Sequence, residues 1–296
     1  MAGIALSPDG IAVAHVLQRP GEVPVLARCE FREAAALRQE QVLGELAREH
    51  RLGDCRCVSV AAQRDFSLLL VEAPQVDPTE LKAAVRWRIR ELLDFHIDDA
   101  VIDVFDIPGQ RERGRPKLMY VVAARMAAVK QHIGLLERAG AQLEVIDIPE
   151  LCQRNLAAQL PEDQNGVAFL RLGHGDGLLT LTRDGALYLA RTIDFGVAQL
   201  KEDGERLVEA LVLEVQRSLD YYESYFSLPP ISALVMAPTE EPLPGVINQF
   251  AASLGIPVRV LDLNAVFETG RTLPDALQAR CLTAIGAALR REEKAL

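Results

Sequence analysis

Apolar and polar side chains alternate in three successive segments at the start of the chain. The alternation predicts strands over residues 3–7, 11–17 and 23–31, because successive side chains of a strand point to opposite faces of its sheet. Between them, Ser7-Pro8-Asp9-Gly10 and Arg19-Pro20-Gly21-Glu22 place Pro, which presets φ, ahead of Gly, which accepts a positive φ. The opening of the chain is therefore predicted to be an antiparallel meander.

Helical periodicities follow the meander. Asp77-Pro78-Thr79-Glu80 has an Asp N-cap, Pro at the first helical position and Glu at the third, which together predict a helix start. Gly140 is placed to end a later helix. The pattern predicts helices over 34–49, 81–94, 126–139 and 149–160, and strands over 57–62, 66–72, 101–107, 117–124 and 143–148.

The opening pattern returns after residues 161–166, a segment that is typical of a lobe boundary. Small-residue turns again join short apolar segments in a strand-turn-strand order. The second half is predicted to form strands over 167–172, 178–182, 186–193, 231–236 and 258–261, and helices over 207–226, 246–254 and 277–290. The chain is thus predicted to contain two lobes that begin with the same meander.

Two facing lobes of this kind leave a cleft between them. In a nucleotide-binding version, both turns offer backbone N–H groups to the phosphates, and an acidic residue in each turn organises Mg²⁺ or water. In the other interpretation, such turns only close hairpins. Spacing alone leaves both interpretations open. The candidate cleft residues are Ser7, Asp9, Gly10, Gly173, Gly175 and Asp176.

Composition narrows the classes of function. The 296 residues include 42 acidic and 32 basic side chains, with a formal net charge of −10, which argues against nucleic acid as a direct partner. No apolar run approaches the roughly 18 residues of a membrane span, and the N-terminus lacks a signal-peptide pattern. We expect a soluble cytoplasmic protein, peripheral at the inner membrane only through a partner.

Cysteine and histidine residues give no pattern of a metal or hydrolase site. The five cysteines are an odd, scattered set that does not predict a disulfide framework. The five histidines are equally dispersed, without HxxxH or HExxH spacing, and GxSxG is absent. We therefore expect no metal site and no Ser-His-Asp hydrolase.

Several segments resemble PilM-type pilus assembly proteins. The stretch from Ala84 to Asp103 is similar to that family's AVRWE-like helix and the strand after it. Leu213-Glu-Val-Gln-Arg-Ser-Leu-Asp-Tyr-Tyr222 resembles its EIQRSLDFY helix, the most specific match. The segments 139–149, 254–262 and 284–290 are also similar, so that the resemblance covers nearly the whole chain. Within the family the chain looks most like MshI-like proteins of mannose-sensitive haemagglutinin (MSHA) pilus systems, and GspL-type secretion proteins are more distant.

The resemblance implies an α/β, actin-like fold of the FtsA/PilM type, with duplicated α/β lobes and an inserted α/β subdomain. The first lobe would comprise residues 1–72 together with 148–162 and the C-terminal helix 276–296. The inserted subdomain would comprise residues 73–147, and the second lobe residues 163–275. The family binds the N-terminal cytoplasmic tail of a PilN-like inner-membrane protein, and contact with a pilus assembly ATPase is a further possibility.

The motifs that hold ATP in the family differ in this chain. Ala5 and Arg171 stand where the two phosphate turns carry aspartates, and Pro8 removes a backbone donor. The Gly-Gly on the adenosine side is Ala237-Pro238. We therefore predict no ATPase activity and no cofactor, with ATP and Mg²⁺ left as the alternative. Arg171 is instead predicted to pair with an acidic neighbour and hold the cleft shut.

The partner surface is predicted to involve the first half of the insert. In the resembling family the peptide lies between the first lobe and the insert, and the helix 81–94 and strand 101–107 are candidate walls. Arg86, Arg88 and Arg90 would meet an acidic peptide, or form an ordinary solvated helix face. For Trp87, packing at the edge of the core is favoured over peptide contact.

Three functions follow from this sequence. The first is a non-catalytic PilM/MshI-like scaffold of type IV pilus assembly. The second is an active ATPase of the same fold in which Asp9 and Asp176 are the functional carboxylates. The third is a small-molecule kinase of the wider actin-like superfamily, which is disfavoured because no carboxylate is recognised at the expected strand ends.

Overall fold

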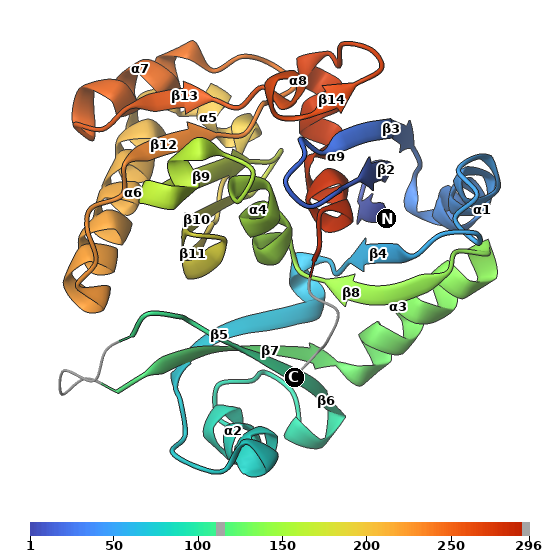
Figure 1. The fold of residues 1–296 in the computed structure, drawn as a ribbon, viewed down its shortest axis with the longest axis horizontal. Helices are drawn as coiled ribbons and strands as arrows, with labels where there is room; N and C mark the ends of the chain where they lie inside the picture. The colour runs from blue at the N-terminus through green and yellow to red at the C-terminus, as the bar shows by residue number, and fades with distance from the viewer. Residues whose placement is uncertain (111–115, 292–296) are drawn as a thin grey trace.

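The computed structural model describes residues 1–110 and 116–291, and its first lobe is built on a six-stranded sheet (Figure 1). The strands lie in the order β14-β3-β2-β1-β4-β8, antiparallel through the opening meander and parallel from β1 to β8. Their bounds are β1 (Ala2–Ser7), β2 (Gly10–Leu17), β3 (Val25–Glu33), β4 (Cys57–Val60), β8 (Leu143–Asp147) and β14 (Glu268–Thr269).

The second lobe repeats this topology in a five-stranded sheet. The order β11-β10-β9-β12-β13 corresponds strand for strand to β3-β2-β1-β4-β8. The bounds are β9 (Val167–Leu172), β10 (Gly177–Arg183), β11 (Ala186–Ile193), β12 (Ala233–Met236) and β13 (Val258–Val260). The predicted duplication of the meander is confirmed.

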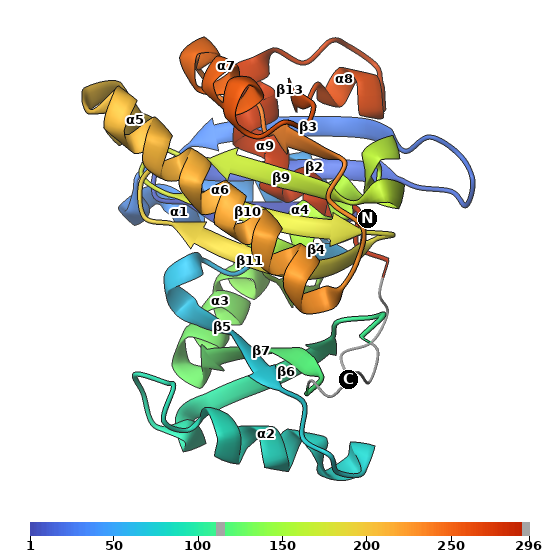
Figure 2. The same cartoon turned by 90° about the vertical axis from the view of Figure 1, so that its left-hand side faces the viewer.

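Helices and the two sheets alternate in five layers (Figures 1 and 2). One outer face of the first sheet packs on α1 and α3, and the outer face of the second packs on α6 and α7. The helices α4 and α9 lie between the sheets and share one apolar core with both. The bounds are α1 (Gln39–Glu49), α3 (Met126–Ala139), α4 (Pro149–Ala157), α5 (Val197–Glu202), α6 (Gly204–Phe226), α7 (Pro244–Ser253), α8 (Leu263–Val266) and α9 (Asp275–Ala288).

The two central helices cross in close contact. A Cβ atom on Gly286 of α9 would overlap the carbonyl oxygen of Cys152 on α4. The Nδ2 of Asn155 donates a hydrogen bond to the carbonyl oxygen of Gly286 at 2.9 Å. Small side chains at such a crossing let the two backbones approach and keep dispersion contacts continuous. The crossing fixes where each sheet lies relative to the other.

The inserted subdomain is a three-stranded sheet in the order β5-β7-β6, with β5 (Phe66–Glu72), β6 (Ala100–Asp106) and β7 (Leu118–Arg125). One face is covered by α2 (Leu81–Ile89), through Val85 and Ile89. The other face packs on the second lobe, where Tyr120 accepts a hydrogen bond from the N–H of Ala190 at 3.1 Å. The insert therefore touches the second lobe as well as continuing from the first.

Strand pairing differs from the predicted boundaries at both ends of the insert. The strand β5, assigned by sequence to the first lobe, pairs with β7 of the insert. The strand β8, assigned to the insert, pairs with β4 of the first sheet, and α3 packs on α1. Apolar periodicity finds a strand but does not identify the edge with which it forms hydrogen bonds. Of the C-terminal segment assigned to the first lobe, residues 292–296 lie outside the described residues.

The helix α2 is also shorter than predicted, ending at Ile89 rather than Asp94. Beyond it, the carboxylate of Asp94 pairs with Arg125 at 3.0 Å, and the guanidinium of Arg125 lies 4.3 Å from the ring centroid of Phe95. Both contacts draw residues 94 and 95 toward the end of β7. Tertiary contacts thus override the local helical pattern.

We predict that Gly286→Val lowers the free energy of unfolding by at least about 3 kcal/mol, because the new side chain overlaps the backbone of α4. Urea unfolding followed by circular dichroism measures the change. Gly44→Ala in α1 is the matched control: its Cβ meets no heavy atom within 4 Å, and it should stabilise by about 0.5–1 kcal/mol. Wild-type stability in Gly286→Val would contradict the close crossing.

Candidate functional site: the charged cleft between the lobes

The first turn of the cleft is held by an arginine from α9. Ser7 donates its hydroxyl hydrogen to Oδ1 of Asp9 at 2.6 Å, and Arg280 forms an ion pair with Asp9. The same guanidinium pairs with Glu240 at 2.7 Å and lies 4.6 Å from the ring centroid of Phe31. Arg280 thereby links the first turn to the loop that follows β12 in the second lobe.

The charges around Asp9 favour its ionised form. Burial opposes ionisation, but the hydrogen bond from Ser7 and the guanidinium of Arg280 together hold the pKa of Asp9 below its usual range. A carboxylate in this state is chemically able to bind a cation. Here, however, it is already paired with Arg280, which it shares with Glu240.

The second turn carries its own ion pair. Arg171 pairs with Asp176 at 2.7 Å, within the same turn. Arg171 thus has the acidic partner that the sequence predicted, but this ion pair does not reach across the cleft. No hydrogen bond or ion pair joins the two turns to each other in the described part of the chain.

The backbone of the second turn is also engaged. The first N–H groups of α5 donate to the turn, from Val197 to the carbonyl of Gly173 at 2.8 Å and from Ala198 to that of His174 at 3.0 Å. The N–H of Gly173 donates to the carbonyl of Asp176 at 2.7 Å. These donors would otherwise be available to an anion.

Two buried carboxylates that the sequence did not single out lie where β8 leads into α4. Asp147 ends β8, accepts from Arg290 at 2.8 Å, and accepts from the N–H of Ile148 at 2.8 Å. Burial raises the pKa of Asp147 above its usual range, against the opposing charge of Arg290. A carboxylate does therefore stand at a strand end, contrary to the reason given against the kinase, although its oxygens are occupied.

Glu150, three residues on, is buried and only partly satisfied. Its Oε1 accepts from the side-chain amide of Gln63 at 3.2 Å, and its Oε2 has no hydrogen-bond partner within the described residues. Burial raises the pKa of Glu150, although Gln63 and the charge of Arg171 act in the opposite direction. The signal in the sequence was a pair of carboxylates directly after a parallel strand, where side chains meet at the sheet edge.

Ala237-Pro238, which the resemblance assigns to the adenosine side, follows the end of β12. The N–H of Ala237 donates to the carbonyl of Leu170 at 2.8 Å, which continues the pairing of β12 with β9. The adjacent pocket, lined in part by Pro238 and Leu243, has a volume of about 220 Å³. Pockets for drug-sized ligands usually measure about 300–1,000 Å³.

The predicted partner residues lie on α2, at the far side of the insert from the lobes (Figure 2). Trp87 is 75% exposed, so the favoured interpretation that it packs in the core is wrong: Val85 and Ile89 fill that face of the helix. The guanidinium of Arg90 lies 6.0 Å from the Trp87 ring centroid. Because α2 packs only on its own sheet, it forms no wall against the first lobe.

The other two arginines of α2 make contacts within the insert. Arg86 donates to the carbonyl of Ile97 at 2.7 Å, and Arg88 donates to that of Glu72 at 2.8 Å. These contacts tie α2 to its neighbouring segments. Trp87, near the end of α2, and Arg90, directly after it, are both exposed and contact each other.

Two further searches cover the described residues. Within 1–110 and 116–291, no group of three or more His, Cys, Asp or Glu side chains is arranged to hold a metal ion. No helix within the same ranges is long and apolar enough to cross a membrane.

Comparisons with known proteins support the fold. A chain in a PilM–PilN type IV pilus biogenesis complex matches with a TM-score of 0.76 at 20% identity, covering 97% of each chain. The cytoplasmic domain of EpsL, an inner-membrane component of the type II secretion system of Vibrio cholerae, matches with a TM-score of 0.52 at 15% identity, covering 95% of this chain and 92% of that one. Neither a family profile nor a curated protein sequence matches the chain. The chain has the actin-like α/β fold that the resemblance to PilM implied.

Because the pKa of Glu150 is raised, its ionisation costs stability as pH increases from the unfolded pKa, about 4.3, through the higher folded value. Glu150→Gln removes this cost. We predict that the variant gains stability over the wild type from about pH 4.5 upward and reaches a plateau at neutral pH. Urea unfolding between pH 4.5 and 8 measures the difference.

Glu144→Gln, at an exposed ion pair with Arg56, is the control for this experiment and should show no such gain with pH. If the stability of Glu150→Gln relative to the wild type falls as pH rises, that result would contradict the assignment of a destabilising buried carboxylate.

Proposed function

We propose that this protein is a non-catalytic scaffold of type IV pilus assembly that binds the N-terminal cytoplasmic tail of a PilN-like inner-membrane protein. The observation that carries the proposal is the match over 97% of both chains to a chain in a complex described as PilM with PilN. The similarity to the EpsL cytoplasmic domain supports a place beside an inner-membrane partner. In this proposal the protein is cytoplasmic and reaches the membrane through that partner.

The non-catalytic part of the proposal rests on the charges in the cleft. Phosphoryl transfer needs groups that position Mg²⁺ and stabilise charge on the phosphates. Ala5 and Arg171 stand at the two aspartate positions, and the nearby carboxylates of Asp9 and Asp176 each hold a guanidinium. A nucleotide would have to displace these pairs before a metal reached either carboxylate.

The finer identity follows the sequence resemblance. We propose an MshI-like role in an MSHA-type pilus, with the pilus assembly ATPase as a second partner. The proposed organisation keeps a first lobe, an insert and a second lobe, with the insert delimited by its sheet, from β5 to β7.

For the contact with the tail, we propose the exposed pair Trp87 and Arg90 at the C-terminal end of α2. Trp and Arg are the side chains that most often dominate binding energy at interfaces, because they bury large areas and make directed contacts. Trp87 is held at the surface beside Arg90, and an acidic or apolar tail residue would find both contacts together.

An ATP-binding protein of the same fold is the alternative, with Asp9 and Asp176 as its carboxylates. Its support is the low pKa of Asp9, which keeps that group ionised. The kinase alternative gains Asp147 at the end of β8, but Arg290 and the N–H of Ile148 occupy that carboxylate.

We predict that the full chain captures a synthetic peptide with the sequence of the PilN-like tail encoded beside it. Trp87→Ala and Arg90→Ala should each weaken capture about tenfold, as loss of an interface anchor does. Arg206→Ala, at an exposed pair on α6, should leave capture unchanged. Fluorescence anisotropy measures the affinities.

Absence of capture by the wild-type chain would contradict the scaffold function. If Trp87→Ala and Arg90→Ala both bind the tail normally, the function stands and the tail binds at another surface.

We also predict no saturable heat on titration with Mg-ATP up to about 1 mM. At this ligand concentration, a complex with a binding free energy weaker than about −4 kcal/mol would go undetected. Isothermal titration calorimetry makes this measurement. A low-micromolar dissociation constant would instead favour the ATP-binding alternative.

A further inference from the structure

The outer edge of β3 is largely unpaired. This strand runs from Val25 to Glu33, and β2 pairs with it along its full length on one side. On the other side, β14 pairs only with Val25 and Leu26. Beyond Leu26, the outer edge has no strand beside it in the described part of the chain.

The register identifies which backbone groups are free. In an antiparallel pair, alternate residues direct their N–H and C=O groups to the partner strand, and the others direct them away. The N–H of Ala34 donates to the carbonyl of Asp9, which shows that the backbone groups of Ala34 face β2. Counting back by twos, the backbone groups of Arg32, Glu30 and Arg28 also face β2. The groups that face outward are therefore those of Cys29, Phe31 and Glu33.

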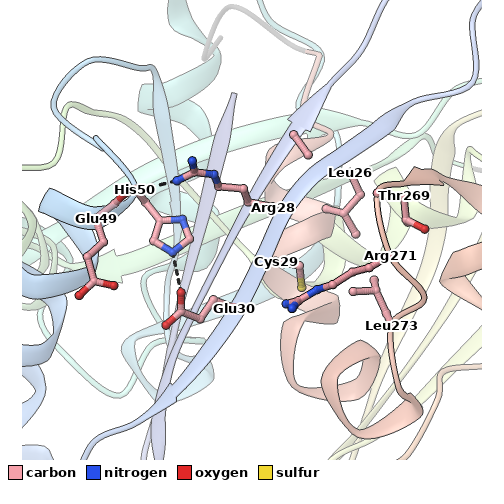
Figure 3. Close-up of a pocket in the computed structure, with 11 residues that line it drawn as sticks. Leu26, Arg28, Cys29, Glu30, Glu49, His50, Thr269, Arg271 and Leu273 are labelled. Carbon is pink, nitrogen blue, oxygen red and sulfur yellow. Dashed lines mark hydrogen bonds and ion pairs between the residues drawn. The ribbon is translucent and has the colours of Figure 1, made fainter.

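An open pocket of about 610 Å³ lies along this edge (Figure 3). Five consecutive residues of β3, from Leu26 to Glu30, line one side of it, and Thr269 to Arg271 line another. Figure 3 shows the guanidinium of Arg271 extending from the end of β14 toward Cys29. The pocket thus begins where the pairing of β14 with β3 stops.

The acidic and basic side chains along the pocket differ in whether they have an oppositely charged partner. Glu30 and Glu49 both pair with Arg32, and Glu30 also contacts His50 at 2.9 Å. Arg28 donates only to a backbone carbonyl, that of Glu49, at 3.3 Å. Neither Arg28 nor Arg271 has a carboxylate partner among the described residues. The two acidic side chains share the guanidinium of Arg32, whereas the guanidiniums of Arg28 and Arg271 have no such partner in the described ranges.

From the free backbone groups and these guanidiniums, we infer that the edge of β3 binds an extended acidic peptide segment of a partner, which adds a strand to the six-stranded sheet. Edge strands that keep unpaired N–H and C=O groups are templates for strand addition. A strand at this place would satisfy Cys29, Phe31 and Glu33 and bring acidic side chains to Arg28 and Arg271. The site is separate from α2 and does not depend on the function proposed above.

Backbone amide exchange in the full ¹⁵N-labelled chain tests this inference. The probe is a nine-residue peptide that alternates Val and Glu, measured by NMR with and without the peptide. Binding should slow exchange of the Cys29, Phe31 and Glu33 amides about tenfold or more. The amides of Arg28, Glu30 and Arg32, already bonded to β2, should exchange as before. This alternation distinguishes strand addition from general stabilisation.

Matched controls separate the backbone contribution from the charge contribution. A peptide N-methylated at alternate residues should lose binding, because it cannot complete the ladder. Arg271→Glu should weaken binding of the acidic peptide about tenfold by charge repulsion, whereas Arg206→Glu on α6 should not.

Three results would overturn the inference. The first is no protection of the three amides at millimolar peptide. The second is equal affinity for a peptide that alternates Val and Lys. The third is protection that rises with protein concentration alone, which would assign the edge to a second copy of the chain. Each result is independent of whether the PilN-like tail binds at Trp87.

Discussion

The close crossing of α4 and α9 is the contact on which the rest of the structure depends. Each lobe supplies one sheet, and these two helices lie between the sheets in a single apolar core. Gly286 admits the backbone of α4 at the crossing, and Gly3 admits α9 against β1 in the same way. Because the core is continuous, the position of one lobe determines that of the other.

That crossing also decides which charges meet in the cleft. The helix α9 carries Arg280 in its first half, and Arg290 follows its end. Arg280 reaches Asp9 and Glu240, and Arg290 reaches the buried Asp147. The two pairs of Arg280 are partly exposed, and exposed ion pairs contribute about 0–1 kcal/mol each, so the apolar core rather than these two pairs holds the lobes together. The ion pairs of Arg280 and Arg290 place a guanidinium beside the carboxylates of Asp9 and Asp147.

Much of the fold could be predicted from the sequence. The repeated meander and the long helices follow from local periodicity, and the structure confirms both. The boundaries of the insert could not be predicted, because pairing partners such as β5 with β7 are long-range choices. Trp87 was assigned to the edge of the core, although the residues of α2 that face the sheet, Leu81, Val85 and Ile89, recur every fourth position and leave Trp87 outside that face.

The cleft was predictable only in part. The substitutions at Ala5 and Arg171 are visible in the sequence, and they gave the expectation of a changed phosphate site. The partners could not be predicted: Arg280 lies 271 positions from Asp9, and Asp147 lies 143 positions from Arg290. Such contacts depend on how the lobes pack, which no local pattern records.

The most direct test of the central claim is one titration of the PilN-like tail into the full chain, performed with and without Mg-ATP. A scaffold that does not use the nucleotide should bind the tail with the same affinity, within about twofold, in both conditions. Tail binding that changes tenfold or more with ATP would show that the cleft still holds a nucleotide and is coupled to the partner surface, and would contradict the account.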